Sequence, residues 1–234
     1  MAELSEAFAT ALRLLVTFDR DLVEIVLLSL RVSLLAVLLA AGVGLPLGAT
    51  LASTRFPGRS ALTTVLNALM GLPPVVVGLA IYLLLSRSGP LGELNLLFTP
   101  TAMIVAQFVL ITPIVAALSR DTFESLWDEY GDQLRSLGAS RPRALTTLLF
   151  EGRAALSVAI LAGLGRAIAE VGAVQIVGGN IAHSTRVMTT AIALETSRGD
   201  LPLALGLGIL LVALSIFLNG AAYGIRQWLE PSHG

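Results

Sequence analysis

The sequence predicts an all-α membrane protein with five transmembrane helices, and three observations lead to that prediction. Of the 234 residues, 55% are hydrophobic and only 13% are charged, whereas a soluble domain carries about 25% charged residues. The mean hydropathy is +0.84. Several long stretches contain no charged residue at all. This composition excludes both an ordinary water-soluble domain and a disordered chain.

Four of the five spans are predicted from charge-free runs. A helix that crosses the hydrocarbon core of a bilayer, about 30 Å thick, needs about 20 mainly apolar residues, and each run is longer than that. We place these spans at about residues 25–53, 61–86, 94–119 and 201–225.

A fifth span is predicted over residues 154–177, although Arg166 and Glu170 interrupt it. One charge alone costs about 2.5–3.5 kcal/mol at the centre of a span, but residues four apart share a helix face and can form an ion pair. Two interpretations stay open, because the pair could fasten its helix to its neighbours or line a transport pathway.

The two ends of the chain fall outside the spans. Residues 1–21 mix charges with apolar residues at helical spacing, which is typical of an amphipathic helix at a membrane surface. A frayed polar leader is the alternative, and the pattern of a secretory signal is missing. Residues 227–234 form a predicted C-terminal tail.

The distribution of arginine predicts the orientation of the chain. All fifteen basic residues are arginine. Two of them lie within predicted spans, eight fall on one side of the spans and five on the other. Since cytoplasmic loops carry the excess of basic residues, we expect the richer side to be cytoplasmic. An odd number of spans then places the N-terminus outside and the C-terminus in the cytoplasm.

Small residues recur at every fourth position of the first span. The stripe consists of Ala36, Ala40, Gly44, Gly48 and Ala52. Helices in lipid associate through close backbone approach, which such a stripe allows. The stripe therefore predicts a tight helix contact, either inside the chain's own bundle or between two copies of the chain.

The second span contains Gly71, Pro73 and Pro74 near its midpoint. Two prolines in a row remove two backbone donors and break a helix, and broken helices near the bilayer centre are a recurring feature of transporters. A passive kink is the alternative. The polar residues Asn67 and Gln107 join this break as candidates for lining or gating a pathway, together with Arg166 and Glu170.

The residue inventory excludes several activities. The chain has no cysteine and no lysine, which excludes thiol chemistry and the lysine of a P-loop ATPase. No metalloprotease or serine-hydrolase pattern is found, and only two histidines are available. We therefore expect no catalytic residue, no metal site and no cofactor. The net charge of −1 gives no reason to expect nucleic acid as a partner.

The most charged part of the chain, residues 120–153, is predicted to be a loop of two short helices. Apolar residues recur at helical spacing in its first half, Gly138 ends that helix, and Ser140 followed by Pro142 begins the second. A helix–turn–helix loop that exposes apolar residues favours a docking element over a linker.

This loop resembles the EAA loop of binding-protein-dependent ABC transporter permeases, which inserts a short coupling helix into the ATPase subunit. Asp132 stands at the position of the family's glutamate, Gln133 and Leu134 replace its two alanines, and Gly138 matches its glycine. The resemblance implies that the residues that couple the chain to an ATPase are Asp132, Arg135, Leu137, Gly138, Ala139 and Ser140.

Other segments resemble the same family in the same order, over roughly residues 25–225. They include the Gly71–Leu79 segment and the Ala167–Ala173 segment with its A-x-x-E-x-G-A pattern. Gly179-Asn180-Ile181, a few residues before Thr185, is similar to the molybdate, sulfate and tungstate branch. The segment from Met188 to Asp200 is most similar to tungstate-uptake permeases.

The resemblance implies a type I ABC importer permease fold and a pore-forming subunit in the inner membrane. We expect a homodimer, two ATPase subunits that bind the ATP, and an extracytoplasmic oxyanion-binding protein. The loop 120–153 is then cytoplasmic. The outer loop 178–200 faces the binding protein, with Asn180, Arg186 and Arg198 as candidate contacts.

Tungstate is the expected ion, with molybdate or sulfate as the alternatives. Two other classes of membrane protein remain as alternatives, a secondary transporter and a channel. A secondary transporter more often shows a paired internal repeat, which these five spans lack, and a channel would need no docking loop.

Overall fold

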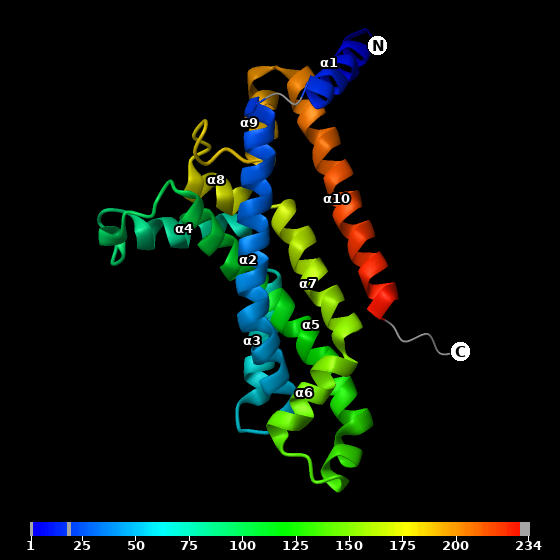
Figure 1. Ribbon diagram of the computed structural model, residues 1–234. Helices are drawn as coiled ribbons and strands as arrows, with labels where there is room; N and C mark the ends of the chain where they lie inside the picture. The colour runs from blue at the N-terminus through cyan, green and yellow to red at the C-terminus, as the bar shows by residue number, and fades with distance from the viewer. Residues whose placement is uncertain (1, 18–19, 230–234) are drawn as a thin grey trace. The chain divides into compact units, whose positions relative to one another are not determined.

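The structure is a computed structural model, and it describes residues 2–17 and 20–229 (Figure 1). Every regular element in these ranges is a helix. The all-α prediction is therefore confirmed for this part of the chain. The outermost residues 230–234 of the predicted C-terminal tail lie outside the described residues.

Among the described residues, the N-terminal half contains four α-helices and a short 3₁₀ helix. Their bounds are α1 Ala2–Thr17, α2 Arg20–Ser53, α3 Arg59–Met70, α4 Pro74–Leu85 and η1 Gly92–Leu94.

The C-terminal half contains six α-helices in the part that the structure describes, up to residue 229. Their bounds are α5 Pro100–Ser136, α6 Arg141–Glu151, α7 Arg153–Ile168, α8 Gly172–Gly178, α9 Met188–Arg198 and α10 Leu201–Leu229.

Three of the described helices, α2, α5 and α10, are long and apolar enough to cross a membrane. The number rises to five if each of two bent pairs, α3 with α4 and α6 with α7, counts as one span. Five spans therefore stay a prediction, whereas the apolar character of the helices is confirmed.

Two predicted spans are interrupted in the structure. The run 61–86 is divided into α3 and α4 where Gly71, Leu72 and Pro73 intervene, and the run 154–177 is divided into α7 and α8 by residues 169–171. The first break follows from the prolines, since Pro74 occupies the first turn of α4, where its missing N–H leaves no donor unpaired.

The chain divides into two compact units. Unit 1 consists of residues 1–36, 73–107 and 166–218, and unit 2 consists of residues 37–72, 108–165 and 219–234. Each unit has its own buried residues.

In unit 1, α4 packs against α8. A Cβ atom added to Gly78 would lie 2.8 Å from Cα of Ala173, so the two backbones are almost in contact. Elsewhere in the unit, Leu22, Ala191 and Leu207 form a small apolar cluster.

In unit 2, the small-residue stripe of α2 packs against α5. A Cβ atom added to Gly44 would lie 3.0 Å from Cβ of Val115, and one added to Gly48 would lie 2.7 Å from the carbonyl oxygen of Ala116. The stripe therefore serves a contact inside the chain, at least at these two glycines. A second cluster, formed by Ala49, Phe123, Leu148 and Leu156, joins α2, α5, α6 and α7.

Candidate functional site

The predicted coupling loop occupies the end of α5, the turn after it and α6. The first half of the loop is not a separate short helix, because α5 runs without a break from Pro100 to Ser136. The second half is α6, which is followed after Gly152 by α7 at an angle of 74°.

Gly138 ends α5 as predicted. Its φ is +71°, and its N–H donates to the carbonyl oxygen of Arg135 while the N–H of Ala139 donates to that of Leu134. These two bonds define a Schellman motif, which needs a left-handed residue at this position. Glycine adopts that conformation without the cost that a Cβ atom imposes.

The side chains around this turn are exposed. Asp132 forms an ion pair of 3.3 Å with Arg135, and the two side chains are 96% and 65% exposed. Leu137 is 81% exposed, and Ser140 precedes α6 without a side-chain cap bond. At the other end of α6, Phe150 is 64% exposed. Such exposed apolar side chains beside charges are typical of a protein-binding surface.

A hollow of about 550 Å³ lies beside the loop in unit 2. Its lining is mostly polar and includes Asp132, Arg135 and Ala139 of the predicted coupling set, together with residues of the α2–α3 connection.

In unit 1, Glu170 forms a junction between helices. Its Oε2 pairs with Nη1 of Arg166 at 2.9 Å, and its Oε1 accepts the N–H of Ala173 at 2.9 Å. The backbone carbonyl oxygen of Glu170 accepts the hydroxyl of Thr189 at 2.8 Å. The side chain is 2% exposed. A buried carboxylate therefore connects α7 to the start of α8, and the backbone carbonyl oxygen of the same residue connects to α9.

Gln107 lies in the same region and is 3% exposed. Its Nε2 donates to the carbonyl oxygen of Ala167 at 3.1 Å, while its buried Oε1 has no partner among the described residues. A cavity of about 10 Å³ is lined by Gln107, Glu170, Ser33 and Thr189, among others. That volume holds about one water molecule, and a tetrahedral oxyanion does not fit.

The structure thus brings together Gln107, Arg166 and Glu170. The remaining pathway candidates lie around the break between α3 and α4. Asn67 is exposed on α3, Gly71 caps the C-terminus of that helix, and Pro73 and Pro74 begin α4.

The turn after α8 explains the Gly-Asn-Ile…Thr pattern. Gly179 and Asn180 both have positive φ, +71° and +51°, a conformation that glycine and asparagine tolerate best. The hydroxyl of Thr185 donates to the carbonyl oxygen of Gly178 and accepts the N–H of Ile181 at 3.0 Å. Asn180 Nδ2 donates to the carbonyl oxygen of Thr190 at 3.2 Å, so this motif ties the turn to α9.

The two outer-loop arginines differ in their surroundings. Arg198 is an exposed side chain paired with Glu195 at 3.2 Å. Arg186 is half-buried, and its Nε lacks a partner among the described residues.

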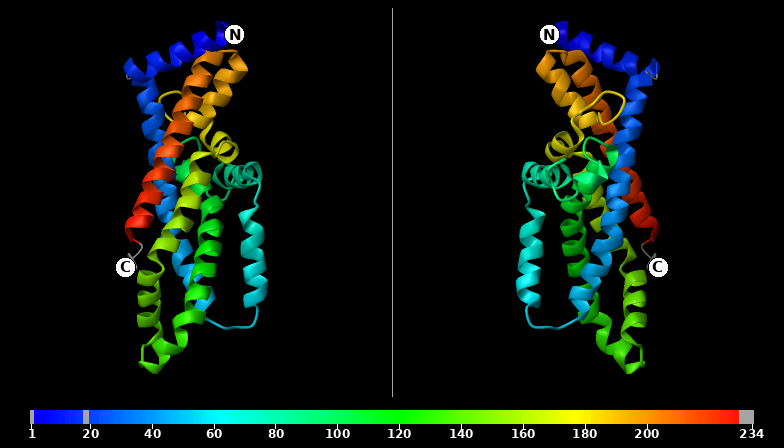
Figure 2. Two further views of the ribbon diagram at one scale, coloured as in Figure 1. Left: turned by 90° about the vertical axis from the view of Figure 1, so that its right-hand side faces the viewer. Right: turned by 90° about the vertical axis from the view of Figure 1, so that its left-hand side faces the viewer.

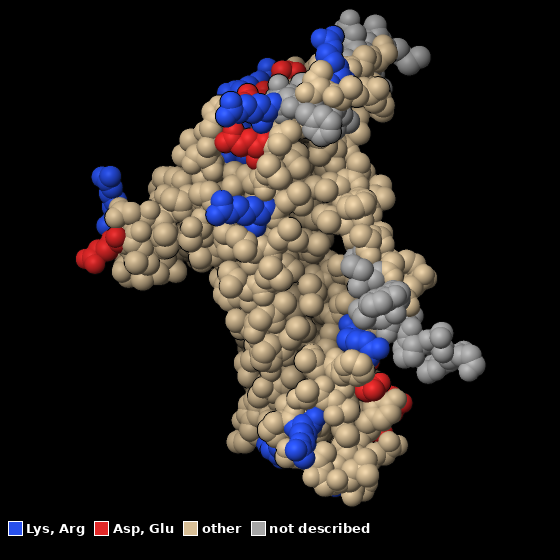
Figure 3. Space-filling model, viewed as in Figure 1, with Lys and Arg blue, Asp and Glu red and all other residues tan. Residues whose placement is uncertain are grey.

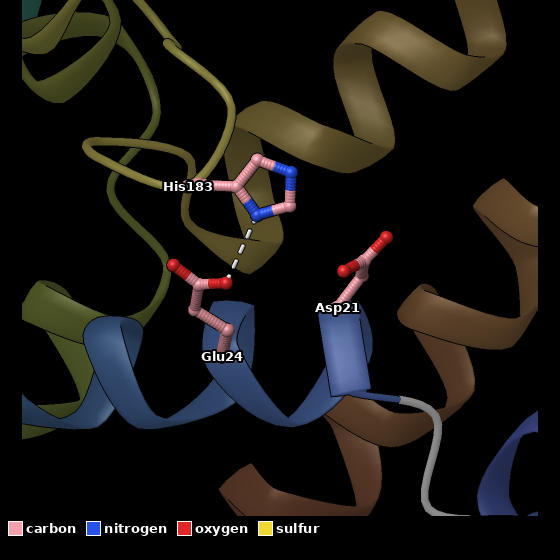
Figure 4. Close-up of side chains that lie close together, drawn as sticks. All are labelled: Asp21, Glu24 and His183. Atoms are coloured by element: carbon pink, nitrogen blue, oxygen red, sulfur yellow. Dashed lines mark hydrogen bonds and ion pairs between the residues drawn. The ribbon is translucent and has the colours of Figure 1, made fainter.

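Sequence reasoning missed an acidic and histidine cluster beside Arg186. His183 Nδ1 lies 3.0 Å from Glu24 Oε2, and Asp21 completes the group (Figure 4). All three are exposed, and within the described chain no other group of His, Asp and Glu is placed to hold a metal ion. Glu24 raises the pKa of His183 by hydrogen bonding and by its charge, and Asp21 adds to the effect. Since 159 residues separate the paired side chains, no local pattern could have shown the contact.

A second missed group lies in unit 2, where Arg59, Arg120 and Glu124 meet. Arg120 and Glu124 stand four residues apart, a spacing that allows an ion pair on one helix face. No spacing rule connects Arg59 to Glu124, which is 65 residues away.

These features, an apolar helical chain with an exposed helical loop that contains a glycine turn, are those of an integral membrane protein. The chain belongs to the family described as binding-protein-dependent transport system inner membrane component, whose model matches residues 44–233. The resemblance predicted from the loop and span motifs is therefore confirmed.

Individual relatives agree with this assignment. The tungstate uptake system permease protein TupB of Peptoclostridium acidaminophilum is 40% identical over 227 residues, which cover 97% of this chain and 100% of that protein. A probable anion ABC transporter permease protein of Haloferax volcanii is 42% identical over 218 residues, 91% of this chain and 94% of that protein. TupB of Campylobacter jejuni is 35% identical over 222 residues, 95% of this chain and 93% of that protein.

Proposed function

We propose that this chain is the permease subunit of an ATP-driven oxyanion importer and that its ion is tungstate. The observation that carries the proposal is the 40% identity to a tungstate uptake permease along almost the whole chain. The similarity therefore includes the outer loop and the coupling loop as well as the apolar helices.

The ATP is bound and hydrolysed by a partner. This chain has no lysine for a P-loop, and the exposed surface around Gly138, with Leu137 and Phe150, supplies a site on which an ATPase subunit docks. Two copies of this chain form the pore, two ATPase subunits bind their loops, and an extracytoplasmic binding protein delivers the ion. The coupling residues are Asp132, Arg135, Leu137, Gly138, Ala139 and Ser140.

Transport follows from differential binding. ATP stabilises one conformation of the ATPase pair over the other, and the docked loop carries that preference into the helices. A dianion needs hydrogen-bond donors along its path but no site that holds it tightly, which leaves selectivity mainly to the binding protein. Pathway and gate residues are Asn67, Gly71, Pro73, Pro74, Gln107, Arg166 and Glu170.

The proposal is tested by reconstituting the chain in proteoliposomes with its ATPase and binding protein. Tungstate uptake should require ATP, and hydrolysis should rise when the loaded binding protein is added. Competition by molybdate and sulfate identifies the ion: if either displaces tungstate at equal concentration, the tungstate assignment is wrong. Uptake driven by a proton or sodium gradient without the partners would contradict the whole proposal.

A further inference from the structure

Helix α3 has little apolar contact with the rest of unit 2. Leu66 is its one buried residue within the described chain, and it packs with Leu51, Ala116 and Ala117. The helix is flanked by Gly58, which has φ +91°, and by Gly71. Because glycine gives the backbone its greatest freedom, the position of α3 depends on contacts other than hydrophobic burial.

Polar contacts supply that attachment at the N-terminus of α3. Arg59 donates from Nη2 to Oε1 of Glu124 at 2.6 Å and from Nε to the carbonyl oxygen of Leu51 at 2.7 Å. Its guanidinium therefore bridges the end of α2 and α5. Figure 2 shows the ribbon of α3, in cyan, running beside that of α5, in green.

A second arginine supports the same carboxylate. Arg120 is 7% exposed; its Nε lies 4.0 Å from Oε2 of Glu124, and it also pairs with the neighbouring Asp121. Its Nη1 donates to Oδ1 of Asn67 on α3 at 3.4 Å. A buried guanidinium is retained only with such partners. Glu124 and Arg120 thus attach α3 to α5 at two positions of α3, Arg59 at its start and Asn67 near its end.

Both residues lie at the start of the coupling loop, in the part of α5 that leads to the turn at Gly138. Between Arg120 and Ser136 α5 has no break, and Phe123 of this segment packs in the cluster with Leu148 of α6 and Leu156 of α7. A helix backed by such a cluster is stiff. A displacement of the loop therefore displaces Glu124 as well.

We propose that Glu124 and Arg120 are positioning residues that make α3 follow the coupling loop. That an ATPase moves the coupling loop rests on the proposed function. That α3 is attached to α5 follows from the contacts alone. Breaking the Glu124 contacts frees α3, and the Gly71–Pro74 break at its end then no longer follows the ATPase.

The attachment is tested by a distance measurement. Because the chain has no cysteine, spin labels can be placed on cysteines introduced at the exposed positions Ser60 of α3 and Ser125 of α5. We expect a narrow distance distribution in the otherwise unchanged full chain and one at least twice as broad in Glu124→Gln. The matched control is Glu129→Gln, an exposed residue of the same helix, whose distribution should stay narrow.

The second measurement separates coupling from stability. In proteoliposomes, Glu124→Gln should lower uptake per ATP hydrolysed at least threefold while hydrolysis stays within twofold of wild type, and Glu124→Asp, which keeps the charge, should recover part of the loss. If Glu124→Gln fails to fold, Arg59→Gln takes its place, because it removes the contacts of Arg59 with Glu124 and Leu51 but leaves Glu124 beside Arg120.

A narrow distribution in the variant would overturn the proposal, and so would a proportional loss of uptake and hydrolysis, which indicates a purely structural role. If the wild-type complex imports no tungstate, the proposed function fails, yet the distance comparison still decides whether Glu124 holds α3.

Discussion

At the scale of single residues, Glu170 shows how a charge is accommodated inside an apolar segment. Arg166 neutralises it, and the N–H of Ala173 uses its second oxygen. Both contacts are inside the chain, in agreement with the interpretation that the pair fastens helices together. A role in the transport pathway stays a prediction.

We expect Glu170→Ala to lower the free energy of unfolding by about 1–3 kcal/mol, since it leaves the buried N–H of Ala173 without its acceptor and the partly exposed guanidinium of Arg166 without its partner. Denaturation of the purified protein in detergent measures the change. Glu170→Gln, which can still accept the N–H of Ala173, is the control and should cost less. A loss under about 1 kcal/mol in the alanine variant would show that the pair does not fasten the helices.

Gly48 allows a second residue-level prediction. A Cβ atom there would meet Oγ of Ser119 and the carbonyl oxygen of Ala116, so Gly48→Ala should cost about 1–3 kcal/mol of stability. Gly42, on the same helix, has nothing within 4 Å of its added Cβ. Gly42→Ala is thus the matched control and should be neutral or stabilising by a few tenths of a kcal/mol. Equal losses in both variants would contradict the close contact of α2 with α5.

Sequence reasoning succeeded where the signal is local. Gly138 was predicted as a helix end because glycine provides the left-handed turn, and the prolines predicted the break before α4. It failed where the partner is distant. The pairs Arg59–Glu124 and Glu24–His183 join residues 65 and 159 positions apart, and one sequence carries no information about such pairs.

At the scale of elements, the continuity of α5 corrects the expectation that the loop begins with a separate helix. The first charges after the span suggested a boundary at residue 120. Charged side chains do not end a helix, however, and the segment up to Ser136 contains good helix formers with a single glycine, Gly131. Hydropathy marks the limit of the apolar run, whereas the end of α5 is set by the left-handed turn at Gly138.

The Schellman turn of α5 gives a testable consequence. Gly138→Ala places a Cβ atom at φ +71° and should destabilise the turn by about 1–2 kcal/mol, which we expect to appear as faster amide exchange in residues 134–140 and weaker stimulation of the ATPase. Asparagine tolerates this conformation better. If Gly138→Asn and Gly138→Ala behave alike, the backbone conformation is not what the loop requires.

The contact between the outer loop and the start of α2 should depend on pH. The pKa of His183 is raised above 6.5 by Glu24 and Asp21, with Arg186 opposing. A raised pKa means that the pair stabilises the loop below pH 6.5 and that this stabilisation is lost as the pH rises through the raised pKa. Amide exchange of residues 180–186 should therefore be slower at pH 6 than at pH 8. After correction for intrinsic exchange rates, His183→Gln should abolish this difference in exchange between pH 6 and pH 8. An unchanged pH dependence in the variant would refute the contact.

At the scale of the whole molecule, uncharged residues dominate the surface, as the face in Figure 3 shows. Large apolar side chains are exposed along α2 and α10, for instance Leu38, Val43, Ile216 and Phe217. In a soluble protein such surface would promote aggregation. In a bilayer it contacts lipid, which agrees with the inner membrane family of the chain.

The orientation of the chain can be tested through its lack of cysteine. Single cysteines at Ser136 and at Ser184, both exposed, provide reporters in the coupling loop and the outer loop. A thiol reagent that does not cross membranes should label Ser184→Cys in intact cells and Ser136→Cys only after the inner membrane is opened. The reverse pattern would place the coupling loop outside and would contradict the proposed docking of an ATPase.

The 37 residues of α5 amount to a length of about 55 Å at a rise of about 1.5 Å per residue. On the proposed function α5 crosses the bilayer, and a core of about 30 Å then leaves roughly 25 Å of the helix projecting into water. Such a projection works as a lever arm whose pivot lies at the membrane surface. A tilt of about 10° at the pivot would move the tip of the helix by about 4 Å. A modest closure of the proposed ATPase pair is therefore geometrically sufficient to reorient the helix within the lipid.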